Sequence, residues 1–385
     1  MQPAFEVADV LSAHWFGVQH STLNTWQLRT LDAVRRCRTA SMGSHADGCT
    51  SCGHLRISYN SCRNRHCPKC QGRQREQWIQ AREQELLPVP YFHVVFTLPE
   101  ALNKLCMYKP REMYDTLFST AWSVMNSFGH DQKWLGAQTG MISILHTWGQ
   151  TMTLHPHLHC IVPGGGLTKA GKWKRAKNKG KYLFNVKAMS IAFRGRFIAA
   201  LKELLPTEME KTFVNTLYKH NWVVYAKRPF TGPQSVVEYL GRYTHKIAIS
   251  NHRLKGMDQA GITFSYKDYK HGSVKKEMTL DALEFIRRFS LHILPKGLVR
   301  IRHYGILSST GKKAAAAIIK EQLPDATTPV ITRAAPQPYN PNECPCCRKE
   351  TMQTIMRFNR RGPPTDWQQL AQDLLECITA KKEAA

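Results

Sequence analysis

The chain of 385 residues is long enough for two or three domains, each with a hydrophobic core of its own. Charged residues make up 21% of the sequence and hydrophobic residues 42%, which excludes a largely disordered chain. The 54 Lys and Arg residues against 28 Asp and Glu residues give a formal net charge of +26, which points to a polyanionic partner, above all nucleic acid.

The N-terminal stretch MQPAFEVADVLSAHWFG lacks the basic and then apolar pattern of a secretory signal peptide. No apolar run approaches the roughly 20 residues that span a bilayer. We therefore expect a cytoplasmic protein whose thiols stay reduced. Its 12 cysteines are then expected to be metal ligands or buried thiols rather than disulfides.

The hydrophobic pattern predicts alternating helices and strands along most of the chain. Basic helices are expected over 23–40 and 71–87, and a buried strand begins at Tyr91 after two prolines. The elements expected after this strand are, in chain order, a helix over 109–128, strands over 141–148 and 157–162, a basic hairpin over 168–186, helical sequence over 187–218, a strand over 221–230, a helix over 232–246, a strand over 262–269, a helix over 277–294, a Pro- and Thr-rich linker over 326–343 and a helix near 366–382.

The segment CTSCGHLRISYNSCRNRHCPKC contains the pairs Cys49-x2-Cys52 and Cys67-x2-Cys70. Two such pairs, about a dozen residues apart, predict one tetrahedral four-thiolate Zn²⁺ site of the structural kind. Cys62 lies close by and could replace a ligand, help to build a second site or have only a local role; the same holds for His66. The module is expected to direct the following basic residues toward phosphates: Arg56, Arg63, Arg65, Lys69 and Arg73.

The pair Cys344-x2-Cys347 near the C-terminus has no second pair close to it in the sequence. It is therefore a weak indication of a metal site.

The stretch LHPHLHCIVPGGG carries histidines at alternate positions of a predicted strand. His157 and His159 therefore point to one face while Leu158 points to the other, and Pro156 leaves His155 at the edge. Two imidazoles so placed can share one metal ion, although surface or core histidines would give the same pattern. Imidazoles suit Zn, Ni or Mn, whereas a third ligand with oxygen would favour Mg or Mn. The candidates for that third ligand are Gln150, Glu238 and His146.

The stretch VVEYLGRYTHK carries Tyr239 and Tyr243 four residues apart, which places both phenols on one face of a helix. Two packed tyrosines with their hydroxyl groups at the rim would look the same in the sequence. Together with a metal-binding histidine pair and a basic chain, the tyrosines fit one chemistry. A metal ion polarises a phosphodiester and a tyrosine oxygen attacks the phosphorus.

Several of these motifs resemble those of a known family. HPHLHCIVPGGG resembles the HUH motif of single-strand DNA endonucleases, YFHVVFTLP resembles the strand that precedes it, and YLGRY resembles the two-tyrosine motif. NSCRNRHCPKCQ and RHYG further resemble transposases of the IS91 family.

This resemblance implies an α+β fold, in which a small four-cysteine zinc-binding module precedes an HUH endonuclease-like antiparallel sheet flanked by helices. The resemblance covers roughly residues 22–305 and implies a zinc-binding, DNA-recognising domain with an N-terminal helix over 1–88 and a catalytic domain over 89–305. The residues after 305 match no part of the family, and their composition predicts a linker with a C-terminal tail and a short helix over 306–385. The structural Zn²⁺ ion would be held by Cys49, Cys52, Cys67 and Cys70.

The activity implied is nicking and rejoining of single-stranded DNA at the ends of an insertion element, in rolling-circle-like transposition. Tyr239 and Tyr243 would be the nucleophiles, and His157 and His159 would hold Mg²⁺ or Mn²⁺. Such a protein would associate with the bacterial nucleoid in the cytoplasm. Two alternatives stay open: a rolling-circle replication initiator or relaxase with the same chemistry, and a zinc-ribbon DNA-binding regulator without catalysis.

Overall fold

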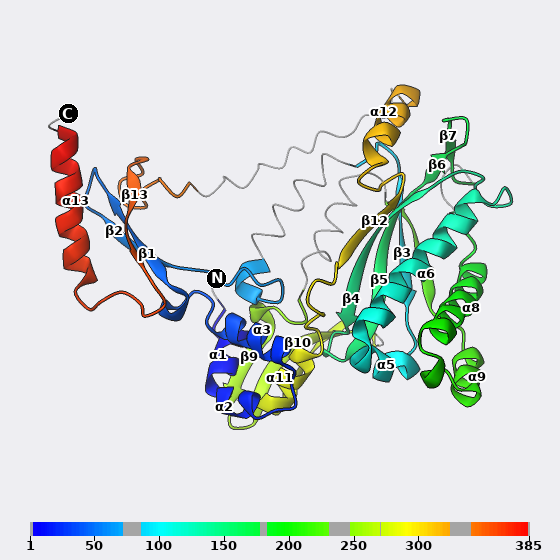
Figure 1. Cartoon of the computed structure of the whole chain (residues 1–385), viewed down its shortest axis with the longest axis horizontal. Coiled ribbons are helices and arrows are strands. Elements are labelled where there is room, and N and C mark those ends of the chain that lie inside the picture. The colour runs from blue at the N-terminus through cyan, green and yellow to red at the C-terminus, as the bar shows by residue number, and fades with distance from the viewer. Residues whose placement is uncertain are drawn as a thin grey trace.

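The computed structural model describes residues 3–71, 86–177, 183–230, 247–269, 271–323 and 340–383. Within these ranges the strands form one five-stranded sheet, two three-stranded sheets and a two-stranded hairpin. Figure 1 shows the five-stranded sheet at one end of the long axis, the sheet β13-β1-β2 at the other end and the sheet β11-β10-β9 between them.

The five-stranded sheet has the order β12-β4-β5-β3-β8, and every neighbouring pair is antiparallel. Helices flank it, so the α+β fold with an antiparallel sheet is confirmed. The four strands expected from the hydrophobic pattern lie in this sheet, and an edge strand joins them. The strands are β3 (Tyr91–Thr97), β4 (Gly140–Trp148), β5 (Leu154–Pro163), β8 (Val224–Phe230) and β12 (Ile301–Gly305).

One face of this sheet carries the largest hydrophobic core. Phe96, Leu145 and Leu158 point from β3, β4 and β5 into this core, where they meet apolar side chains of the covering helices. Pro206 divides the helical sequence expected over 187–218 into two helices, because proline cannot continue the backbone hydrogen bonds. The helices on this side are α5 (Asn103–Tyr108), α6 (Pro110–His130), α8 (Val186–Leu204) and α9 (Lys211–Lys219).

The opposite face of the sheet is covered over part of its length. Ile142, Ile144 and Ile161 pack there with Ile319 of α12 (Lys312–Gln322). Because side chains alternate along a strand, the same face continues from Ile144 to His146 on β4 and from Ile161 to the neighbouring histidines on β5. The same face of the sheet therefore carries apolar side chains over one part of its length and a cluster of imidazoles over the next.

A short hairpin follows β5 and comprises β6 (Gly165–Leu167) and β7 (Trp173–Arg175). A Cβ atom on Gly165 would lie 2.5 Å from the carbonyl oxygen of Lys174, and one on Gly166 would lie 2.5 Å from the carbonyl oxygen of Gln138. The glycines are therefore required by the close approach of neighbouring backbones.

The sheet β11-β10-β9 packs against N-terminal helices in a second core. Leu31 and Val34 of α3 meet Phe264 of β10 and Phe285 of α11 there. This core joins segments more than 200 residues apart. Its elements are α1 (Val7–Ala13), α2 (Trp15–Gln19), α3 (Thr25–Arg35), β9 (Leu254–Asp258), β10 (Gly261–Asp268), β11 (Val274–Leu280) and α11 (Ala282–Ser290).

The third sheet contains strands from both the N-terminal and the C-terminal part of the described chain. β1 (Ser44–Cys49) pairs with β2 (Leu55–Tyr59) on one side and with β13 (Met352–Phe358) on the other, and α13 (Trp367–Glu383) contacts it. The expected linker and tail after residue 305 are therefore wrong in two places. α12 packs against the five-stranded sheet, and β13 completes the sheet of the N-terminal module.

Three expected elements lie wholly or largely outside the described residues: the helix over 71–87, the helix over 232–246 and the linker over 326–343.

Candidate catalytic centre and cysteine clusters

Three histidines on two neighbouring strands form a cluster on the face of the five-stranded sheet that also carries Ile144 and Ile161. His146 of β4 lies opposite His157 of β5, and His159 follows on the same face. One ring nitrogen of each lies within 4.8 Å of the others, and the Nε2 atoms of His157 and His159 are 3.1 Å apart. His146 and His159 are buried and His157 is half-buried, so the cluster is reached from the side of His157.

These positions fit a single metal ion. Metal–imidazole bonds of about 2.1 Å would separate two adjacent ligand nitrogens by roughly 3.0 to 3.4 Å, depending on the coordination geometry. The observed 3.1 Å between the two Nε2 atoms lies in this range.

Contacts around the cluster fix the orientation of its rings. His93 of β3 is buried, and its Nε2 atom lies 2.9 Å from Nδ1 of His159. A proton on that Nδ1 would be donated to His93, so that Nε2 of His159 carries the lone pair that can bind a metal. On the other side, Trp148 stacks on His146 with ring centroids 4.8 Å apart, and the guanidinium of Arg300 lies over the indole at 5.1 Å.

The structure brings one of the three candidate third ligands into the cluster, namely His146. The Gln150 side chain instead accepts a hydrogen bond from the backbone N–H of Lys267 at 3.4 Å. Glu238 lies outside the described residues, as do the proposed nucleophiles Tyr239 and Tyr243.

The cysteines form two groups, and the grouping differs from the one expected. The inner cysteine cluster comprises Cys37, Cys62, Cys67 and Cys70, and the outer cysteine cluster comprises Cys49, Cys52, Cys344 and Cys347. In each cluster the four sulfur atoms lie within 4.8 Å of one another. The single site expected from Cys49, Cys52, Cys67 and Cys70 is therefore wrong in its grouping.

The β1–β2 hairpin explains this separation. Cys49 and Cys52 lie at its turn, whereas Cys62 follows the return strand, which has five residues. Five strand residues span about 17 Å, so the pair at the turn and the cysteines beyond the hairpin are far apart in space. Cys37 precedes the hairpin and therefore lies beside Cys62.

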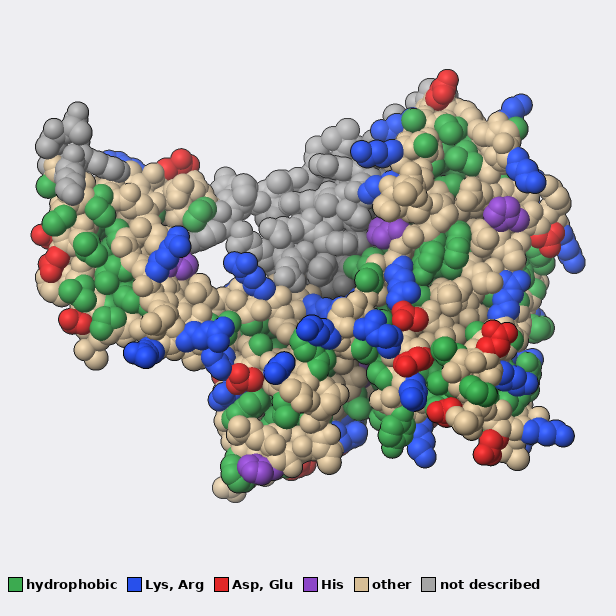
Figure 2. Space-filling model, viewed as in Figure 1, with side chains coloured by type: hydrophobic (Ala, Val, Ile, Leu, Met, Phe, Trp, Pro, Cys, Tyr) green, Lys and Arg blue, Asp and Glu red, His purple; other side chains and the backbone are tan. Residues whose placement is uncertain are grey.

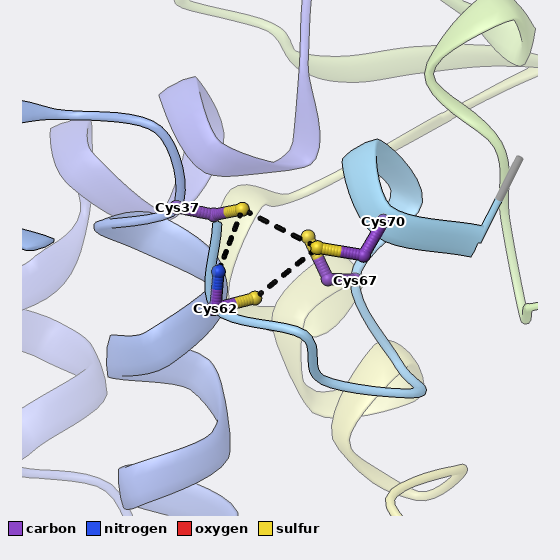
Figure 3. Close-up of side chains that lie close together, drawn as sticks. All are labelled: Cys37, Cys62, Cys67 and Cys70. Carbon is purple, nitrogen blue, oxygen red and sulfur yellow. Dashed lines mark hydrogen bonds between the residues drawn. The ribbon is translucent and has the colours of Figure 1, made fainter. Parts of the chain in front are cut away.

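Figure 3 shows the inner cysteine cluster, in which sulfur atoms from three segments point toward one another. Sγ of Cys70 lies 3.6 Å from Sγ of Cys37 and 3.7 Å from Sγ of Cys62. The backbone N–H of Cys62 donates to Sγ of Cys37 at 3.4 Å, as expected where a sulfur carries negative charge. His66 lies outside this cluster, and burial lowers the pKa of its imidazole to about 3.

Shared neighbouring residues connect the inner cysteine cluster with the histidine cluster. Cys37, Cys67 and Cys70 belong to the core that also holds Met152, from the loop between β4 and β5. His66 and Trp148 line one small cavity, and Trp148 stacks on His146. Trp148 also packs against the core that contains these three cysteines.

Comparisons with known proteins give the family. Two family models match: one described as "Putative transposase" over residues 140–314, and one described as "Transposase zinc-binding domain" over residues 10–98. The chain is 39% identical over 390 residues to "Putative transposase y4qJ" of Sinorhizobium fredii (strain NBRC 101917 / NGR234), with 94% of this chain and 98% of that protein covered. The chain belongs to the IS91 family of transposases.

A second relative of this transposase is the "Transposase for insertion sequence element IS801" of Pseudomonas savastanoi pv. phaseolicola. The two are 27% identical over 313 residues, which cover 76% of this chain and 73% of the relative. No solved structure matches the transposase. Family membership establishes a DNA-binding, DNA-processing enzyme with an N-terminal zinc-binding domain.

The candidate site residues of the transposase fall into different matched segments. The histidine cluster lies within the transposase match, and six cysteines of the two clusters lie within the zinc-binding match. Cys344 and Cys347 lie outside both. Among the described helices, none combines the length and apolar character needed to cross a membrane.

Several basic residues that were expected to face phosphates instead form ion pairs or hydrogen bonds within the protein. Arg56 pairs with Asp47 at 3.0 Å, Lys69 pairs with Glu6 at 2.5 Å, and Arg65 donates to the carbonyl oxygen of Leu298. Arg73 lies outside the described residues. Figure 2 shows other Lys and Arg side chains on all the coloured parts of the visible face, so the positive charge is not confined to the zinc-binding module.

Sequence reasoning missed three residues of these sites: Cys37, His93 and Trp148. Cys37 is a lone cysteine at the end of a helix, with no spacing motif to mark it. His93 lies on the same strand face as Tyr91, two residues away, but its partner His159 becomes visible only once the order of the strands is known.

Proposed function

We propose that this transposase nicks and rejoins single-stranded DNA at the ends of an insertion element through a 5′-phosphotyrosine intermediate, in rolling-circle-like transposition. The single observation that carries the proposal is the convergence of three imidazole nitrogens on one face of the five-stranded sheet. This cluster lies within the segment that matches the transposase family model.

The metal ligands in this proposal are His146, His157 and His159. A bound Mg²⁺ or Mn²⁺ ion would polarise the scissile phosphodiester and offset the charge that develops on its oxygens. Three nitrogen ligands favour Mn²⁺ over Mg²⁺, because Mg²⁺ prefers oxygen ligands. His93 would hold His159 with Nε2 directed at the ion, and Trp148 would hold the ring of His146.

The nucleophile is the phenol oxygen of Tyr239 or Tyr243. It forms a bond to phosphorus while the bond from phosphorus to the deoxyribose 3′-oxygen breaks. The tyrosine loses its proton to solvent and the departing oxygen gains one, which leaves a free 3′-hydroxyl and a 5′-phosphotyrosine. A 3′-hydroxyl of another strand reverses the reaction and joins that strand to the transferred end, and the second tyrosine permits two such exchanges.

The described residues that flank the tyrosine motif support this assignment. Tyr243 precedes Ile247 by four residues, and Ile247 lines the same small cavity as Trp148. Trp148 in turn stacks on His146. Ile247, the first described residue after the tyrosine motif, therefore lies at the cavity of the tryptophan that stacks on His146.

The zinc ion of the N-terminal domain is assigned to the inner cysteine cluster in this proposal. Four sulfur atoms within 4.8 Å of one another, two of them 3.6 and 3.7 Å from Sγ of Cys70, fit a tetrahedral structural site. The backbone N–H groups of Cys62 and Asn64 donate to sulfur atoms of this cluster, and such hydrogen bonds stabilise thiolates.

The experiment is a covalent-adduct assay on a denaturing gel. The purified protein is mixed with end-labelled single-stranded DNA from the element ends, with Mn²⁺, Mg²⁺ or EDTA. We expect a metal-dependent protein–DNA band that disappears in the double variant Tyr239→Phe/Tyr243→Phe, and the single variants rank the two nucleophiles. Tyr225→Phe is the matched control, because Tyr225 is an exposed tyrosine outside the motif.

An adduct that persists in the double variant would contradict the nucleophile assignment. Tight DNA binding without an adduct on any strand would instead favour a zinc-dependent DNA-binding protein. A replication initiator or relaxase would form the same adduct, and the family match argues against it.

A further inference from the structure

We propose that the outer cysteine cluster binds a second zinc ion, which joins the N-terminal module to the C-terminal segment of the chain. Its ligands are Cys49, Cys52, Cys344 and Cys347. Two of them lie outside both family matches, and the site is independent of the proposed catalytic centre.

The sulfur positions fit a tetrahedral zinc site. Sγ of Cys49 lies 3.6 Å from Sγ of Cys347, and Sγ of Cys52 lies 3.6 Å from Sγ of Cys344. Zinc–thiolate bonds of about 2.3 Å place tetrahedral sulfur atoms roughly 3.8 Å apart. The hydroxyl oxygen of Thr351 lies 3.1 Å from Sγ of Cys49, so its O–H group can donate to that thiolate.

The two Cys-x2-Cys loops share a pattern of backbone hydrogen bonds, although they lie almost 300 residues apart in the chain. In the first loop the N–H of Cys49 donates to the carbonyl oxygen of His54, and the N–H of Gly53 donates to that of Cys49, both at 3.0 Å. This turn directs the two sulfur atoms of the pair to one point.

In the second loop the N–H of Cys344 donates to the carbonyl oxygen of Lys349 at 2.8 Å, and the N–H of Arg348 donates to that of Cys344 at 2.9 Å. The residue that follows the second cysteine has a positive φ in both loops, 72° at Gly53 and 62° at Arg348. Two matching turns that face each other supply four ligands without rearrangement.

The surrounding sheet brings the loops together. β13 pairs with β1 along six residues, and Thr354 of β13 donates to the buried carboxylate of Asp47, which also accepts from Arg56 of β2. Leu375 of α13 lies over Gly48, the residue before the first ligand. The small hydrophobic cluster at the site contains Cys49, Cys344 and Met352. Because so few apolar side chains pack there, a bound metal ion would supply most of the stabilisation of this site.

Thiol alkylation of the native, zinc-loaded protein tests the proposal. Cys52 and Cys346 are both exposed, but Cys346 lies outside the outer cluster. We expect Cys346 to react with iodoacetamide at least about tenfold faster than Cys52, and a strong chelator to abolish this difference, because a zinc-bound thiolate is a poor nucleophile. Peptide mass spectrometry measures both rates. Equal rates in the zinc-loaded protein would overturn the proposal.

Metal analysis of variants identifies the ligands. Wild-type protein is expected to contain one more zinc ion per chain than Cys344→Ser/Cys347→Ser, and the matched control Cys346→Ser is expected to retain the wild-type content. The single variant Cys347→His, which keeps a zinc ligand at this position, is expected to retain the second zinc ion. An unchanged zinc content in the double variant would contradict the assignment, and the alkylation test holds even if that variant fails to fold.

Discussion

The inner and outer cysteine clusters have the same four ligand types but occupy different surroundings. Three cysteines of the inner cluster are buried in the core that α1, α2 and α3 share with β9, β10 and β11. The outer cluster lies at the turn of the β1–β2 hairpin, with Cys52 exposed and few apolar neighbours. A zinc ion in the inner cluster should therefore stabilise the main fold, whereas one in the outer cluster should stabilise a peripheral module.

The largest effect is expected from the double variant Cys67→Ser/Cys70→Ser. Loss of zinc from a structural site of this kind removes on the order of 10 kcal/mol of apparent binding free energy, and here the site lies inside a core. We expect little soluble protein, or a melting temperature lower by more than about 10 °C, in thermal denaturation followed by circular dichroism. An unchanged melting temperature would show that the inner cluster has no structural metal.

Loss of catalysis with retention of the fold is expected from His157→Ala. This half-buried side chain contributes a proposed ligand and little of the core, so adduct formation should fall by about 10³-fold or more while the melting temperature changes little. The matched control is His155→Ala, since His155 lies on the same strand but outside the cluster. If both variants lose activity equally, the ligand assignment is wrong.

A smaller effect is expected from His93→Ala. Without its partner, the ring of His159 is no longer held with Nε2 toward the ion, and the apparent affinity for Mn²⁺ should fall about 10- to 100-fold. A Mn²⁺ titration of adduct formation measures this change, and saturating Mn²⁺ should restore most of the activity. His93→Gln, which keeps an acceptor, should be closer to wild type, and a loss that no Mn²⁺ concentration restores would indicate a folding defect instead.

The smallest effect on chemistry is expected from Cys344→Ser/Cys347→Ser. The outer cluster makes no contact with the histidine cluster among the described residues, so adduct formation on short DNA should stay within about threefold of wild type. Hydrogen exchange should nevertheless accelerate in the β13 amides, because the strand loses its anchor. A complete loss of the adduct would place the outer cluster in the catalytic machinery and remove the distinction between the two clusters.

The sequence predicted most of the five-stranded sheet and the facing of its histidines, because alternation along one strand is a local property. His157 and His159 share a face and Leu158 enters the opposite core, as the pattern indicated. The choice of His146 over Gln150 depended on strand register, which a single strand does not reveal.

Cysteine grouping could not be predicted from spacing along the chain. The hairpin between Cys52 and Cys62 separates pairs that are close in sequence, and β13 returns to bring Cys344 beside Cys52. Lone residues such as Cys37 and His93 carry no motif at all. They become recognisable only through partners on other elements.

The central claim is that His146, His157 and His159 bind one metal ion, and pulsed EPR of the Mn²⁺-loaded double variant Tyr239→Phe/Tyr243→Phe tests it most directly. Zn²⁺ is diamagnetic, so the proposed zinc sites contribute no EPR signal. With ¹⁵N-labelled histidine, the proposed centre predicts hyperfine coupling from directly bound imidazole nitrogen, which is lost or reduced in His146→Ala, His157→Ala and His159→Ala and unchanged in His155→Ala. Bound Mn²⁺ without nitrogen coupling, or with coupling that none of the three substitutions alters, would contradict the account.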